Sequence, residues 1–228
     1  MRRGGEGAAT KAEFAVYGGV DGEGSVGVEG AGAGGVSECE TLKRWGSKVK
    51  RAQLEHVLRA CAAITGTTRF VVVGSQSILG QYPEAPADLL TSSEVDIYAP
   101  ESSAASELID GTIGEGSPFH TTFGYHAHGV GPETATLPAG WEGRVIVVST
   151  PATGGATGLC LEANDVAVSK LVAGREKDLV FVGHLIQHGL AEAETIRQRL
   201  VNTPMVDELR GATGARLLKS LELAGARW

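Results

Sequence analysis

The chain has 228 residues, of which 42% are hydrophobic, so it is long enough and apolar enough to bury the core of one full domain. Its formal net charge of −7 argues against a protein that binds nucleic acid through overall positive charge. No stretch approaches the ~18 apolar residues that a membrane-spanning helix needs, and the three cysteines form no CxxC pair, so we expect a soluble cytoplasmic protein with reduced thiols.

The chain opens with a glycine-rich segment. Residues 1–36 hold 12 of the 33 glycines and contain no GxxxxGK[ST] phosphate loop. Glycine loses the most backbone entropy on ordering and has no side chain to bury. We therefore expect residues 1–40 to form a flexible tail.

Residues 41–160 are expected to form an α/β core. Apolar residues at helical spacing predict a first helix that ends at Gly66. The β-branched run Phe70–Val73 predicts a buried strand before a tight turn. The elements expected after it are a short helix from 77 to 79, a loop over 81–93, a strand over 95–98, a helix over 103–109, a strand or hairpin region over 117–137, and a strand over 144–148.

The last third of the chain, residues 161–228, is predicted to be helical. Apolar periodicity and punctuating glycines give four helices, over residues 163–174, 176–187, 193–201 and 204–224. Strands followed by helices favour an α+β fold with a C-terminal helical region.

Gly74 and Ser75 follow the first expected strand directly. Glycine lets a ligand approach the backbone closely, and a serine with free backbone N–H groups can bind phosphate oxygens. Taken alone, the pair is more typical of an ordinary turn.

Glu94 and Asp96 flank Val95 on the second expected strand. Because side chains alternate along a strand, both acids project from one face while Val95 and Ile97 face the core. Two adjacent carboxylates are unfavourable unless a proton or a cation lies between them, and oxygen ligands suit Mg²⁺, which also binds substrate phosphates. The alternative is a surface strand with two hydrated acids.

Lys170 lies in the first C-terminal helix. On one continuous helix, Lys170, Ala173, Gly174, Lys177 and Asp178 would share roughly one face. Cations beside small residues leave room for a bulky anionic ligand. The alternative is a hydrated helix face with internal ion pairs.

Together these features resemble the nucleotidyltransferase superfamily. Gly74-Ser75 after a strand, Glu94-x-Asp96 on a strand and Lys170-x-x-Ala173 on a helix occur in the superfamily's order, over about residues 50–190. The closest likeness is to the AbiE-type toxin branch and its relatives of unknown function.

The resemblance implies a mixed β-sheet flanked by helices, with the helical region completing the active-site cleft. It implies an NTP substrate and two Mg²⁺ ions. The residues that it implicates are Glu94, Asp96 and Lys170 in catalysis, Gly74, Ser75 and Arg175 in nucleotide binding, and Glu94, Asp96 and Asp178 in metal binding.

The sequence also departs from the superfamily pattern. The 18 residues between Ser75 and Glu94 imply a loop insertion, the first acid is Glu rather than Asp, and Arg175 comes earlier than in the toxin pattern. The expected strand over 144–148 has no acid, although many members carry a third carboxylate there. We expect Asp178, Asp165 or Glu142 to supply it, in that order of preference.

The histidines allow two further readings. His126 and His128 would share one face of a strand, which permits a metal site, but the cysteines offer no obvious ligands to complete it. We favour a half-exposed hairpin with polar histidines. His184 and His188 are four residues apart without an HExxH glutamate, so we expect an ordinary helix face.

The sequence therefore predicts Mg²⁺-dependent transfer of a nucleoside monophosphate from an NTP to an acceptor hydroxyl on RNA, protein or a small molecule. The alternative is a catalytically inactive binding module with the same fold. A weaker hypothesis is a toxin whose C-terminal helices contact tRNA or a cognate antitoxin. It rests on a mild basic bias from Arg197, Arg199, Arg210, Arg216 and Lys219.

Overall fold

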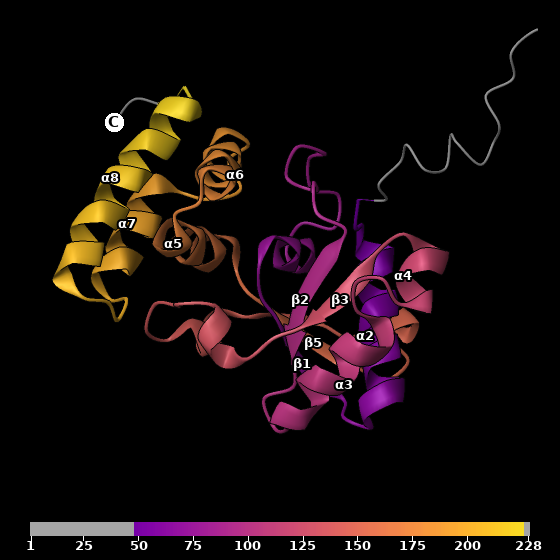
Figure 1. The fold of residues 1–228 in the computed structure, drawn as a ribbon. Coiled ribbons are helices and arrows are strands. Elements are labelled where there is room, and N and C mark those ends of the chain that lie inside the picture. The colour runs from indigo at the N-terminus through magenta and orange to yellow at the C-terminus, as the bar shows by residue number, and fades with distance from the viewer. Residues whose placement is uncertain (1–47, 226–228) are drawn as a thin grey trace, which may run out of the picture. The chain divides into compact units, whose positions relative to one another are not determined.

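A five-stranded mixed β-sheet organises residues 48–225, the part of the chain that this computed structural model describes (Figure 1). The flexible tail expected over residues 1–40 lies outside the described residues. In sheet order the strands are β3 (His126–Gly129), β2 (Glu94–Tyr98), β1 (Arg69–Val72), β5 (Thr157–Cys160) and β4 (Ile146–Val148). β1 pairs with β5 and β2 with β3 in parallel, while β1–β2 and β4–β5 are antiparallel.

Helices pack around this sheet, and the α+β prediction is confirmed. Figure 1 shows α2, α3 and α4 gathered on one side of the strands and α5 to α8 together on the other. Their bounds are Arg51–Thr65 (α2), Ser103–Ile113 (α3), Pro118–Phe123 (α4), Ala163–Ala173 (α5), Glu176–Gln187 (α6), Ala193–Val201 (α7) and Asp207–Leu223 (α8). Within residues 48–225, no helix combines the length and apolar character needed to cross a bilayer.

Of the strand or hairpin expected over 117–137, the strand is present only at residues 126–129, and the hairpin is wrong. The segment begins with α4, where Pro118 occupies the first turn and the Ser117 hydroxyl accepts a hydrogen bond from the His120 backbone N–H. β3 then follows and pairs in parallel with β2, which a hairpin cannot do. Helix α3 also runs to Ile113, four residues beyond the predicted end at Ile109.

β2 orients the two acids. Val95 and Ile97 are fully buried, whereas Glu94 and Asp96 are only partly buried. The core therefore takes one face of the strand and leaves both carboxylates on the other. At the start of the strand, the Ser92 hydroxyl accepts a hydrogen bond from the Glu94 backbone N–H.

The segment from Lys170 to Asp178 is two helices rather than one. Gly174 has φ +68° and ends α5 in the left-handed conformation, and α6 begins after Arg175. A Cβ at Gly174 would lie 2.1 Å from the Arg216 guanidinium carbon. From α8, Arg216 Nη1 donates to the carbonyls of Leu171 and Val172 at 2.8 and 2.9 Å.

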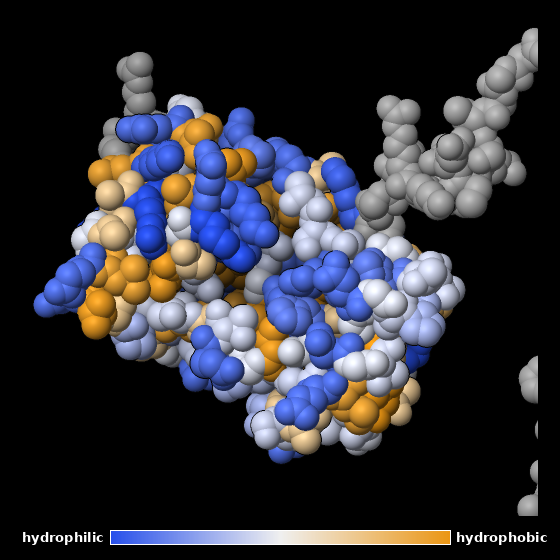
Figure 2. Space-filling view, viewed as in Figure 1, coloured by the Kyte–Doolittle hydropathy of each residue, from blue (hydrophilic) through white to orange (hydrophobic). Residues whose placement is uncertain are grey.

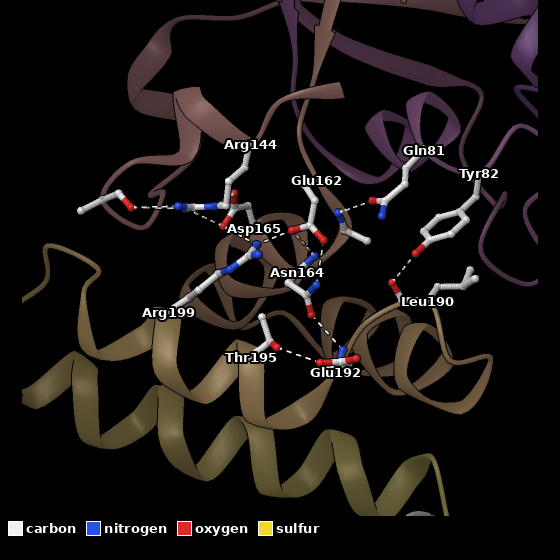
Figure 3. Close-up of polar contacts among 12 residues, drawn as sticks. Gln81, Tyr82, Arg144, Glu162, Asn164, Asp165, Leu190, Glu192, Thr195 and Arg199 are labelled. Carbon is white, nitrogen blue, oxygen red and sulfur yellow. Dashed lines mark hydrogen bonds and ion pairs between the residues drawn. The ribbon is translucent and has the colours of Figure 1, made fainter. Parts of the chain in front are cut away.

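A buried polar network ties the C-terminal helices to the rest of the fold (Figure 3). Asp165 on α5 is fully buried. It accepts hydrogen bonds from Arg144 Nε at 2.9 Å and from Arg199 Nη1, on α7, at 2.8 Å. Arg199 also pairs with Glu162, which precedes α5. Two arginines from distant segments thus fix the start of the helix that carries Lys170.

Candidate active site

Glu94 and Asp96 of β2 face two histidines of β3. The parallel register pairs Glu94 with His126 and Asp96 with His128. His128 Nδ1 lies 3.0 Å from Asp96 Oδ1 and 3.5 Å from Glu94 Oε1. One ligand atom from each of Glu94, Asp96 and His128 lies within 4.8 Å of the other two, which is close enough for one metal ion.

The two carboxyls perturb each other. Burial raises the pKa of Asp96, and the adjacent Glu94 raises it further against the opposing effect of His128. Burial acts on Glu94 in the same direction, but its hydrogen bond with Asp96 and the charges of His128 and His126 outweigh it, so the Glu94 pKa is lowered. The pKa values of the two neighbouring acids are thus shifted in opposite directions. A divalent cation fits such a site, since it neutralises both groups.

Gly74 packs directly against the Asp96 carboxylate. It adopts φ +69°, and a Cβ built on it would lie only 2.2 Å from Asp96 Oδ2. A larger residue would therefore displace the carboxylate. The Gly74 carbonyl accepts a hydrogen bond from the Ser77 hydroxyl at 2.8 Å, and Ser75 starts the 3₁₀ helix η1 (Ser75–Gly80).

The predicted residues meet around one cavity of about 410 Å³. Figure 2 shows the surface hollowed between the C-terminal helices and the sheet, with hydrophilic residues on both sides. The predicted residues that line the cavity are Ser75, Glu94, Asp96, Lys170, Arg175 and Asp178. Gly74 lines a smaller cavity of about 60 Å³ that shares Asp96, Lys170 and Arg175.

Asp178 forms ion pairs with the two basic side chains Lys170 and Arg175 on the helical side of the cavity. Its Oδ1 lies 3.2 Å from Lys170 Nζ, and its Oδ2 lies 2.6 Å from Arg175 Nε. Asp178 is 2% exposed; burial raises its pKa, but the hydrogen bond from Arg175 and the charge of Lys170 outweigh burial and lower it. Lys170 Nζ also lies 5.7 Å from the centre of the Phe181 ring.

A positive charge remains on this side of the cavity. Lys170, Arg175 and Lys177 carry three positive charges against the single carboxylate of Asp178. Arg175 is also within the electrostatic reach of Asp96 and Glu94; its pKa is raised mainly by the Asp178 hydrogen bond and further by these acids. The acids Glu94 and Asp96 therefore lie across the cavity from the basic residues Lys170 and Arg175. This arrangement suits a metal cation and a polyanion bound next to each other.

Of the three acids expected to supply the third carboxylate, Asp178, the first choice, lines the cavity, whereas Asp165 and Glu142 do not. β4, the strand over 146–148, is the edge strand at the far side of the sheet from β2, with β1 and β5 between them. Asp165 is occupied by Arg144 and Arg199. Asp178 remains a predicted metal ligand, although its two carboxylate oxygens form ion pairs with Lys170 and Arg175.

Sequence reasoning considered a metal site at His126 and His128 but favoured polar histidines on a hairpin, and it did not join His128 to the two acids. The signal for His128 was the spacing His126-x-His128, which repeats the spacing of Glu94-x-Asp96, but only the parallel register of β3 and β2 brings the two pairs together. Other cavity-lining residues that the sequence did not indicate are Thr91, Ser92, Thr134 and Phe181.

Comparison with known proteins gives one family. A family model described as a nucleotidyltransferase of unknown function (DUF6036) matches residues 52–208, more than half of the chain. No curated protein and no solved structure matches. The matched region contains every residue assigned to the site from sequence, and also His128.

Proposed function

The chain belongs to a nucleotidyltransferase family of unknown function, and from that premise we propose that it transfers a nucleoside monophosphate from an NTP to an acceptor hydroxyl. One observation carries the proposal: Glu94 and Asp96 line the same cavity as Lys170 and Arg175, which come from a distant part of the chain. Carboxylates for a divalent cation and basic groups for a triphosphate are the two components that this reaction needs.

Glu94 and Asp96 would hold the divalent cation. The resemblance to the superfamily implies that this cation is Mg²⁺. When bound, it supplies Lewis-acid stabilisation of the phosphate oxygens and of the acceptor oxygen. The Ser75 hydroxyl and backbone N–H would bind phosphate oxygens beside Gly74. Asp178 would keep Lys170 and Arg175 directed at the phosphates.

The transfer forms one bond and breaks another. The acceptor oxygen bonds to the α-phosphorus while the bond from that phosphorus to the bridging oxygen breaks, and pyrophosphate leaves. The acceptor proton passes to an Asp96 carboxylate oxygen. Lys170 and Arg175 would neutralise the charge that develops on the leaving pyrophosphate.

Replacing Asp96 tests this proposal. We expect Asp96→Asn to reduce transfer of α-³²P-labelled nucleotide by at least about 10²-fold, because the cation loses a charged ligand. The assay supplies each of the four labelled NTPs with total RNA, purified protein or small hydroxyl compounds as acceptor. The matched control is Asp207→Asn, an exposed acid at the start of α8. Unchanged transfer by Asp96→Asn would refute the assignment.

A toxin function is a finer proposal, which rests on the likeness of Lys170-x-x-Ala173 to the AbiE-type branch. The basic bias of the C-terminal helices gives it little support, because their arginines are used internally. Arg197 pairs with Glu194, Arg199 with Asp165, and Arg210 and Arg216 with backbone carbonyls. In the same assay, Asp96-dependent label on tRNA would support the toxin proposal, and label only on small hydroxyl compounds would oppose it.

A further inference from the structure

We propose that His128 is the third protein ligand of the cation and that it makes the site select Mn²⁺ over Mg²⁺. This inference rests on the proposed function, because it concerns the same cation. It adds a ligand that the sequence pattern of the site did not include.

Position is the first argument. His128 lies opposite Asp96 on the neighbouring parallel strand, so both side chains project from the same face of the sheet. Its side chain is 48% exposed and lines the cavity, and its Nδ1 is within 3.5 Å of an oxygen of each acid. The imidazole thus lies beside both acids, on the side of them that faces the cavity.

The neighbouring groups are worse candidates for this position. The His126 side chain is 6% exposed and lies 3.6 Å from Glu94 Oε2, but it is not among the three residues whose ligand atoms all lie together. Asp178 already contacts Lys170 and Arg175. Among the described residues, His128 is the one that completes a three-ligand group with Glu94 and Asp96.

Donor chemistry gives the selectivity. Mg²⁺ prefers oxygen ligands and retains its waters, whereas imidazole nitrogen suits first-row transition ions. Mn²⁺ accepts carboxylates readily and, unlike Mg²⁺, gains from a nitrogen donor. A set of two carboxylates and one imidazole therefore favours Mn²⁺ over Mg²⁺.

The experiment measures cation binding by the full chain without nucleotide. Electron paramagnetic resonance follows the loss of the free Mn²⁺ signal, Mg²⁺ competition gives the selectivity, and electron spin echo modulation reports a directly bound ¹⁴N. We expect wild type to show ¹⁴N modulation and to bind Mn²⁺ at least about tenfold more tightly than Mg²⁺. His128→Gln should lose the modulation and most of the selectivity, while His188→Gln, at the residue that follows α6, should retain both.

A second variant keeps the test informative if His128→Gln folds poorly. His128→Asp restores an all-oxygen set, and we expect it to bind Mg²⁺ more tightly than wild type does, with no ¹⁴N modulation. Bound Mn²⁺ without nitrogen coupling in wild type, or coupling that persists in His128→Gln, would overturn the ligand assignment. Failure of the proposed function has a different signature, namely a nitrogen-coupled cation in a protein that transfers no nucleotide with any metal.

Discussion

At the scale of single residues, the site depends on how closely Gly74 approaches Asp96. Two separate constraints act at this glycine. Its backbone lies in the left-handed region, and the space where a Cβ would stand is filled by the Asp96 carboxylate. The first constraint affects stability, and the second affects the position of a proposed cation ligand.

We predict that Gly74→Ala weakens cation binding and nucleotide transfer by at least about tenfold, besides destabilising the fold by about 1–2 kcal/mol through its positive φ. Gly66→Ala is the matched control, because Gly66 has nearly the same φ of +70° but no atom within 4 Å of its Cβ position. It should lose similar stability and keep its cation affinity. Urea unfolding and Mn²⁺ titration measure the two effects, and equal affinities in both variants would contradict the prediction.

Individual site residues were predictable where a local rule applied. Alternation along a strand identified Glu94 and Asp96 as neighbours on one face, and the burial of Val95 and Ile97 agrees with that rule. His128 obeys the same rule on its own strand. Its partnership with Asp96 depends on pairing between strands some 30 residues apart, which no local pattern encodes.

At the scale of elements, most of the C-terminal helices were predictable, whereas α4 and β5 were not. The C-terminal helices α5, α6 and α7 begin and end within one residue of the predicted bounds, because apolar periodicity and glycine stops are local signals. β5 has the sequence Thr-Gly-Leu-Cys, which carries no strand signal. It pairs with β1 on one side and β4 on the other, and Gly158 lets its backbone approach Leu58 of α2, where a Cβ would lie 2.8 Å from Leu58 Cδ1.

The start of α5 provides an element-scale prediction. Asp165 is fully buried between Arg144 and Arg199, so we expect Asp165→Ala to lower the free energy of unfolding by about 3 kcal/mol, because it removes the buried carboxylate that both arginines share. The control is Glu194→Ala, which removes an exposed pair with Arg197 and should change stability little. Chemical denaturation measures both. Equal effects would mean that the buried network contributes no more than the surface pair.

At the scale of the whole molecule, the cavity is lined partly by the sheet and partly by the C-terminal helices. β2 and β3 bring Glu94, Asp96 and His128, and the α5–α6 region brings Lys170 and Arg175. A nucleotide that contacts both walls through a cation would bind only when the two parts are packed together. Ligand binding should therefore stabilise the native fold as a unit.

We predict that an NTP raises the melting temperature only when a divalent cation is present, because a triphosphate without its cation would be repelled by Glu94 and Asp96. At a ligand concentration of about 100 times Kd, the stabilisation should be about 2.7 kcal/mol. Thermal unfolding with NTP alone, cation alone and both together measures it. An equal shift with and without the cation would instead favour an inactive nucleotide-binding module.

The close packing of Arg216 against Gly174 bears on how much of the chain a functional protein must include. The family match stops at residue 208, yet Arg216 lies beyond it and binds the last carbonyls of the helix that bears Lys170. A shortened chain ending at residue 208 would keep every side chain that lines the cavity. It would lose the hydrogen bonds from Arg216 to the end of α5, the helix that carries Lys170. We therefore expect a fragment that ends at residue 208, where the family match ends, to bind the cation and transfer nucleotide more weakly than the full chain does.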